Sequence, residues 1–144
     1  MNLHAWIDRE LLSSQEFFER STRVLREEHS GFAPSSELYT AAQQVAHVAA
    51  VIDWFVVGSF SAFGFSMDHD GIESSVRAVE SLTEARRRVA AAYDRARREF
   101  AVQPVAALEE EFSEGIMMTG AKWVVIPAMI EHTAHHRGAL AVYS

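Results

Sequence analysis

The sequence of 144 residues contains no cysteine and carries a net charge of -7 at neutral pH. Without cysteine the protein can form no disulfide, no zinc–thiolate site and no cysteine nucleophile. The negative charge argues against nucleic acid or an anionic membrane as a partner, because both demand a basic surface. No apolar run reaches the ~18 residues of a membrane-spanning helix. The segment Met1–Glu10 also lacks the basic start and apolar stretch of a signal peptide, so we expect a cytoplasmic protein.

Strand-like alternation is missing as well, and the apolar residues recur at helical spacing instead. The length suits one domain, residues 1–144, with a full hydrophobic core. Capping boxes at 40–43 and 81–84 each predict the start of a helix. We therefore expect an all-α four-helix bundle with helices over about 3–28, 41–57, 82–102 and 121–143, and an irregular connector over 105–120. In such bundles, metal and ligand sites are built from inward side chains of facing helices.

Proline is scarce, and one of the three prolines, Pro127, falls inside the range predicted for the last helix. Proline has no backbone N–H and disturbs a helix interior, which predicts either a kink or a later start with Pro127 in the first turn. The first helix is expected to end at Ser30 and Gly31, because glycine is favoured directly after a helix.

The second predicted helix contains a nearly unbroken apolar segment. From Val45 to Val57 every residue is apolar except His47 and Asp53. A helix that is apolar on all sides lies at the centre of a bundle. An unpaired buried polar group costs on the order of 1–3 kcal/mol, so His47 needs a partner. A hydrogen bond inside the core would satisfy it, and so would a metal ion.

Three of the seven histidines lie within five residues of one another, in the segment EHTAHHRGAL at 131–140. His132 and His136 are four residues apart, so they share one face of a helix and can clamp one metal ion. His135 flanks the pair. For the pair alone, a favourable interaction with the helix C-terminus explains the histidines about equally well. His47 offers a third imidazole from another helix, and this favours metal coordination.

The sequence thus predicts a mononuclear metal site at His47, His132 and His136. No histidine has a glutamate three residues before it and no His-Glu-x-x-His motif occurs, which excludes the di-iron carboxylate and common zinc protease patterns. Three imidazoles suit zinc or nickel, with iron or copper as alternatives, and leave one position open for water or substrate. No catalytic residue stands out. Glu131 and Asp53 either orient the imidazoles by hydrogen bonds or are structural or solvated carboxylates.

Two segments resemble the signatures of the DinB/YfiT-like superfamily: HTAHHRGAL at 132–140 resembles its closing helix, and TAAQQVAHVA at 40–49 its second helix. The long first helix and the connector agree, so the resemblance covers essentially the whole chain. It implies an up-down-down-up four-helix bundle, often dimeric, in which His47, His132 and His136 bind a divalent metal. Characterised members include thiol-dependent S-transferases and isomerases that use low-molecular-weight thiols, and many members have no assigned activity.

The chain departs from the family pattern in two places. Ala139 stands where the family usually has glutamine, and the sequence ends at Ser144 where relatives commonly continue. Neither departure touches an expected metal ligand. They bear on the shape of the pocket, and therefore on the identity of the substrate.

Two classes of function agree with these features. The first is a metal-dependent enzyme of the thiol S-transferase or hydrolase type, working as a homodimer on a small-molecule substrate. Because the chain has no cysteine, its thiol would come from a low-molecular-weight cosubstrate. The second is a non-catalytic, stress-related protein that binds a metal or a small ligand. The simplest alternative to both is that the histidines only pack inside a metal-free bundle.

Overall fold

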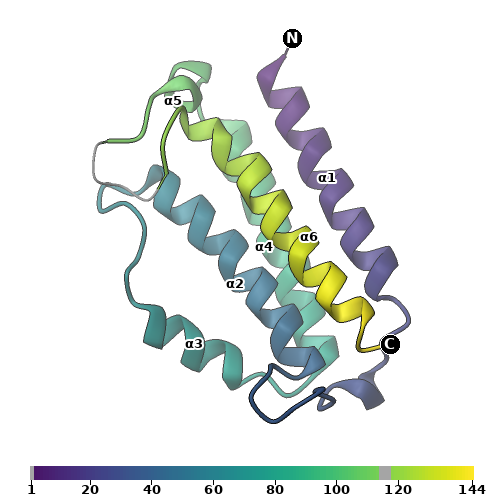
Figure 1. The fold of residues 1–144 in the computed structure, drawn as a ribbon. Helices are drawn as coiled ribbons and strands as arrows, with labels where there is room; N and C mark the ends of the chain where they lie inside the picture. Colours follow the sequence, from purple (N-terminus) through teal and green to yellow (C-terminus); the bar gives the residue numbers. More distant parts are fainter. Residues whose placement is uncertain (1, 114–117) are drawn as a thin grey trace.

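The computed structural model describes residues 2–113 and 118–144, and these are folded as a bundle of helices (Figure 1). The four long helices are α1 (Leu3–Thr22), α2 (Ala41–Phe60), α4 (Leu82–Val102) and α6 (Val125–Ala141). Shorter elements are α3 (His69–Arg77), α5 (Val105–Glu109) and two 3-10 turns, Glu27–His29 and Lys122–Val124. The described residues contain no β-strand beyond one isolated bridge. The expectation of an all-helical bundle is therefore confirmed.

Each long helix packs against two others, because both α1 and α2 contact α4 and α6. Helices α1 and α6 run in the same direction, and α2 and α4 run in the opposite one (Figure 1). At the start of α1 and α6, the rings of Trp6 and Trp123 meet edge to face with centroids 5.9 Å apart. At the start of α2 and α4, Ser30 accepts hydrogen bonds from the backbone N–H groups of Ala42 and Leu82. The first turns of α2 consequently lie beside the last turns of α6.

Helix α2 is the central helix of the bundle, as its apolar sequence predicts. Buried side chains occur on most of its circumference, and it contacts α3, α4 and α6. By length and composition alone α2 could cross a membrane, although it lacks an unbroken apolar run of that length. In the structure, 61% of its most apolar window is buried inside the bundle, as in any core helix.

The predicted helix starts agree with the structure. The hydroxyl of Thr40 accepts from the N–H of Gln43, and the Gln43 side chain accepts from the N–H of Thr40. Ser81 likewise caps α4 by accepting from the N–H of Glu84. Helix α6 begins at Val125 with Pro127 in its first turn, which is the later start that the proline allowed. The starts of α2 and α4 depend on local hydrogen bonds, which short sequence motifs specify.

Two other expectations require correction. Helix α1 ends at Thr22 instead of near 28, because the guanidinium of Arg86 on α4 donates to the carbonyls of Thr22 and Leu25, at 2.7 Å each. The region 105–120, expected to be irregular, contains the short helix α5. Part of that predicted connector, including Met117, lies outside the described residues.

Candidate metal centre

The three histidines predicted as ligands lie together between α2 and α6. His47 is on the second turn of α2, and His132 and His136 are on successive turns of α6. The ring centroid of His47 is 4.6 Å from that of His136 and 5.3 Å from that of His132, and the two α6 rings are 4.5 Å apart. One ligand nitrogen from each ring lies within 4.8 Å of the other two. The arrangement could hold a metal ion.

The spacing of the nitrogens suits a small transition-metal ion. The Nε2 atoms of His132 and His136 are 3.1 Å apart. Two imidazole nitrogens bound to one tetrahedral zinc ion, at ~2.05 Å from it, are about 3.3 Å from each other. No carboxylate belongs to this group of residues, so the donor set is three neutral nitrogens.

The protonation state of the histidines also suits coordination. Burial and, to a lesser extent, the neighbouring imidazoles lower the pKa of His136 to about 3 and that of His132 to about 4. Burial likewise lowers the pKa of His47. All three rings are therefore neutral at pH 7, and each keeps a nitrogen lone pair available for a metal.

His135 does not join this group. Its side chain is exposed, although its ring centroid lies 5.0 Å from that of His136. The helical period explains the difference. His132 and His136 lie close to the face on which Val125 and Met129 are buried, whereas His135 lies outside this face.

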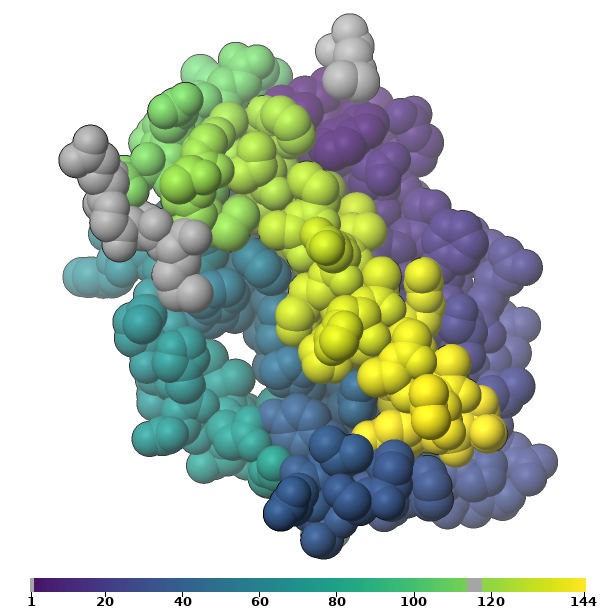
Figure 2. Space-filling view, in the orientation of Figure 1, coloured from purple at the N-terminus to yellow at the C-terminus, as the bar shows by residue number. Residues whose placement is uncertain are grey.

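A cavity of about 320 Å³ opens beside the three histidines, between α2, α3 and α6. Figure 2 shows a hollow between α3 and the rest of the bundle on this face. The cavity wall is mostly apolar, with two of the three proposed ligand histidines, a further histidine and one carboxylate among its residues: His47, Ala50, Val51, Trp54, Phe55, His69, Ile72, Glu73 and His132. Its volume is in the range of small-ligand pockets.

Glu73 is a residue of this cavity that the sequence analysis did not identify. Its carboxylate accepts hydrogen bonds from the Tyr39 hydroxyl and from Nε of Arg77, the latter at 2.7 Å. These bonds lower the pKa of Glu73, so it is a carboxylate at neutral pH. Burial and Glu73 raise the pKa of Tyr39 to about 12, so Tyr39 stays protonated. The Tyr39 ring in turn lies against His47, with centroids 5.4 Å apart.

Gln44 and Tyr143 were also missed. The amide nitrogen of Gln44 lies 3.1 Å from Nδ1 of His136, and the Tyr143 hydroxyl lies 3.2 Å from the amide oxygen. Tyr143 falls within the range 121–143 predicted for the last helix, but the sequence analysis assigned it no part in the site. Gln44 could have been identified from the sequence, because it stands three residues before His47 and so lies on the same face of α2.

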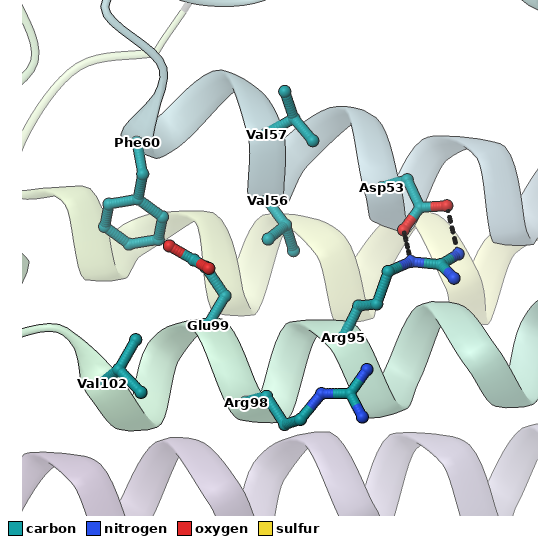
Figure 3. Close-up of a pocket in the computed structure, with 8 residues that line it drawn as sticks. All are labelled: Asp53, Val56, Val57, Phe60, Arg95, Arg98, Glu99 and Val102. Atoms are coloured by element: carbon teal, nitrogen blue, oxygen red, sulfur yellow. Dashed lines mark hydrogen bonds and ion pairs between the residues drawn. The ribbon is translucent and has the colours of Figure 1, made fainter.

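The two carboxylates considered for orienting the imidazoles have other surroundings. Asp53 makes a bidentate ion pair with Arg95, with N–O distances of 3.0 and 2.7 Å (Figure 3). This pair lines a separate cavity of about 750 Å³ between α2 and α4. Glu131 is exposed, and within the described residues no hydrogen bond joins it to a histidine. Asp53 is therefore a structural carboxylate, paired with Arg95, and does not orient the imidazoles.

The chain matches no protein-family model, and it matches no curated protein.

Proposed function

We propose that this protein binds one divalent transition metal through His47, His132 and His136. The observation that carries the proposal is the convergence of three half-buried imidazoles, from two helices far apart in sequence, with their ligand nitrogens within 4.8 Å of one another. Polar groups removed from water need partners, and a shared cation would bind one nitrogen of each ring at once. The low pKa values of His132 and His136 support the proposal, because protons would compete with the metal only in acid.

The donor set favours zinc or nickel, with iron or copper as alternatives. Neutral imidazole nitrogens suit these ions, whereas magnesium and calcium prefer oxygen ligands. Three protein ligands leave one coordination position open, and the cavity beside His47 and His132 gives that position room for a ligand. A metal held here would lower the pKa of a thiol or a water molecule placed in the cavity.

We further propose that the protein is a DinB/YfiT-like enzyme of the thiol S-transferase or hydrolase type. Two features support this assignment. The two segments that resemble the family signatures supply all three histidines, and the directions of the four long helices are compatible with the up-down-down-up order that the resemblance implies (Figure 1). The apolar wall formed by Val51, Trp54 and Ile72 would hold an apolar part of a substrate. Because the chain has no cysteine, a thiol would come from a cosubstrate.

One observation favours a second candidate, a metal-binding protein without catalytic activity. The carboxylate in the cavity, Glu73, already accepts hydrogen bonds from Tyr39 and Arg77. These bonds lower the pKa of Glu73, and a carboxylate with a lowered pKa is a weaker general base. With Glu73 engaged in this way, the cavity offers binding groups more clearly than it offers a base.

Elemental analysis of the purified protein tests the metal site directly. We expect about one equivalent of zinc or nickel in the wild type, and loss of most of it in His47→Ala and His132→Ala. Removing a ligand should weaken binding by more than the roughly 10–100-fold that an outer partner contributes. A metal-free wild type that also fails to take up added zinc, nickel, iron or copper would contradict the proposal.

Turnover assays separate the two candidate functions. Panels of low-molecular-weight thiols with electrophiles, and of esters, are assayed with and without a chelator. Turnover that needs the metal and disappears in His47→Ala supports the enzyme. Stable metal binding without turnover across both panels supports the binding protein.

A further inference from the structure

A chain of hydrogen bonds connects His136 to the backbone at the start of α2. Gln44 lies one turn before His47, with only 7% of its surface exposed. Its side-chain amide faces Nδ1 of His136 at 3.1 Å on one side and the Tyr143 hydroxyl at 3.2 Å on the other. The same hydroxyl lies 2.8 Å from the carbonyl oxygen of Tyr39. Three side chains and one carbonyl thus form a single polar path inside a mostly apolar region.

The two orientations of the Gln44 amide differ in what they require of Tyr143. With the amide oxygen toward Tyr143, the hydroxyl faces two acceptors, this oxygen and the carbonyl of Tyr39, but has only one proton. With the amide rotated by half a turn, its NH₂ donates to Tyr143 and the hydroxyl donates to Tyr39. The carboxamide fills the same space in both orientations. Only the rotated one also gives the amide oxygen of Gln44 a donor, because that oxygen then faces Nδ1 of His136.

The rotated orientation also decides where the proton of His136 sits. The amide oxygen then faces Nδ1 of His136, and an oxygen can only accept, so Nδ1 must carry the hydrogen. A neutral imidazole has one hydrogen, so Nε2 keeps its lone pair. Nε2 is the atom that lies 3.1 Å from Nε2 of His132, on the side where the three rings meet.

We propose that Gln44 is a positioning residue that holds the hydrogen of His136 on Nδ1 and so presents Nε2 to the metal, with Tyr143 fixing the orientation of the amide. The inference rests on the proposed metal site at His47, His132 and His136. It assigns to Gln44 the role that outer partners of metal-bound histidines generally have, which is to set the tautomer and the ring orientation. The path is complete without a metal, so the same tautomer is expected in the metal-free protein.

Zinc affinity of three variants tests the role of the acceptor. Gln44→Met keeps the size of the side chain but removes the acceptor, and we expect it to bind zinc about 10–100-fold more weakly. Gln44→Glu keeps an acceptor for the Nδ1 hydrogen and should stay within about threefold of the wild type. Gln15→Met is the matched control, because Gln15 lies on α1 and, within the described residues, bonds only Glu19. Affinities are measured by competition with a chromophoric chelator.

A second readout does not depend on metal at all. In the metal-free, ¹⁵N-histidine-labelled protein, NMR distinguishes imidazoles that carry the hydrogen on Nδ1 from those that carry it on Nε2. We expect the Nδ1–H form for His136 in the wild type and in Tyr143→Phe a mixture of the two forms, because the amide is then free to rotate. The signal of His136 is identified from its absence in His136→Asn.

The possible results separate this inference from the metal site itself. A wild type that binds zinc, together with a folded Gln44→Met that binds equally well, overturns the role of Gln44 and leaves the metal site intact. The Nε2–H form of His136 in the metal-free wild type overturns it as well. If Gln44→Met fails to fold, the comparison of Tyr143→Phe with the wild type by NMR decides. A wild type without metal affinity contradicts the proposed function, and the tautomer is still measured independently.

Discussion

Two glycines inside long helices have opposite surroundings. A Cβ added to Gly58 on α2 would lie 2.1 Å from the ring of Phe65, whereas one added to Gly138 on α6 meets nothing within 4 Å. Phe65 cannot easily move aside, because its ring is buried and packs against Trp54 with centroids 4.7 Å apart. Gly58 therefore allows the loop after α2 to close over the helix, next to the wall of the proposed substrate cavity.

The same substitution should consequently have opposite effects at the two positions. Alanine improves the helix propensity by up to about 1 kcal/mol, so Gly138→Ala should raise the free energy of unfolding by about 0.5–1 kcal/mol. In Gly58→Ala, overpacking against Phe65 outweighs this gain, and we expect a net loss of about 1–2 kcal/mol. Urea unfolding measures both. Equal effects at the two positions would show that the Phe65 contact is not a constraint.

At the residue scale, the sequence predicted the three ligand histidines but not the residues that surround them. His132 and His136 could be paired from their spacing, and His47 from its place in an apolar helix, because both arguments need only the geometry of one helix. Gln44 obeys the same geometry and could have been found. Glu73 could not, because its place in the cavity depends on how α3 packs against α2, which no local pattern encodes.

At the scale of elements, one carboxylate joins the segment after α1 to the start of α4. Glu27 accepts hydrogen bonds from the backbone N–H and the hydroxyl of Thr83, at 2.7 and 2.5 Å. Thr83 lies in the first turn of α4, where backbone N–H groups have no partner inside the helix and favour a negative charge. The bonds from Thr83 are the main reason that the pKa of Glu27 is lowered to about 2.

The acid stability of Glu27→Gln tests this contact. A carboxylate whose pKa falls from 4.5 to about 2 on folding stabilises the native state fully above pH 4.5, and this stabilisation is lost as the pH falls toward 2. We expect Glu27→Gln to be less stable than the wild type at pH 7, with a difference that shrinks between pH 4.5 and 2.5. Urea unfolding across this range measures it.

A difference that stays constant with pH would contradict the contact. Glu16→Gln is the control at pH 7, where its exposed pair with Arg20 should contribute less than about 1 kcal/mol.

The ends of elements show why only part of the fold was predictable. The starts of α2 and α4 follow from Thr40 and Ser81, whose side chains bond N–H groups three residues away. The end of α1 at Thr22 follows instead from Arg86, 64 residues further along the chain. Helical periodicity continues beyond Thr22 to Leu25, so the sequence alone predicts a longer helix.

At the scale of the whole molecule, the proposed metal would cross-link α2 and α6, two helices that lie far apart in the sequence. The site lies where the start of α2 meets the end of α6, and α6 closes the bundle by packing against both α1 and α2. A metal that binds only the folded chain stabilises it by mass action. The bundle has its own apolar core, so we expect a folded protein without metal as well.

Thermal unfolding with and without metal therefore tests two things together: the proposed metal site, and the choice of His136 over His135 as one of its ligands. Free zinc at 100 times its dissociation constant should stabilise the protein by about 2.7 kcal/mol, which for a chain of this length raises Tm by roughly 10 °C. His135→Ala should keep this shift, because the His135 side chain is exposed and outside the group of ligand nitrogens. His136→Ala should lose most of it.

The reverse pattern, with the shift lost in His135→Ala and kept in His136→Ala, would make His135 the ligand and place the site on a different face of α6. Loss in neither variant would mean that the zinc binds away from these histidines.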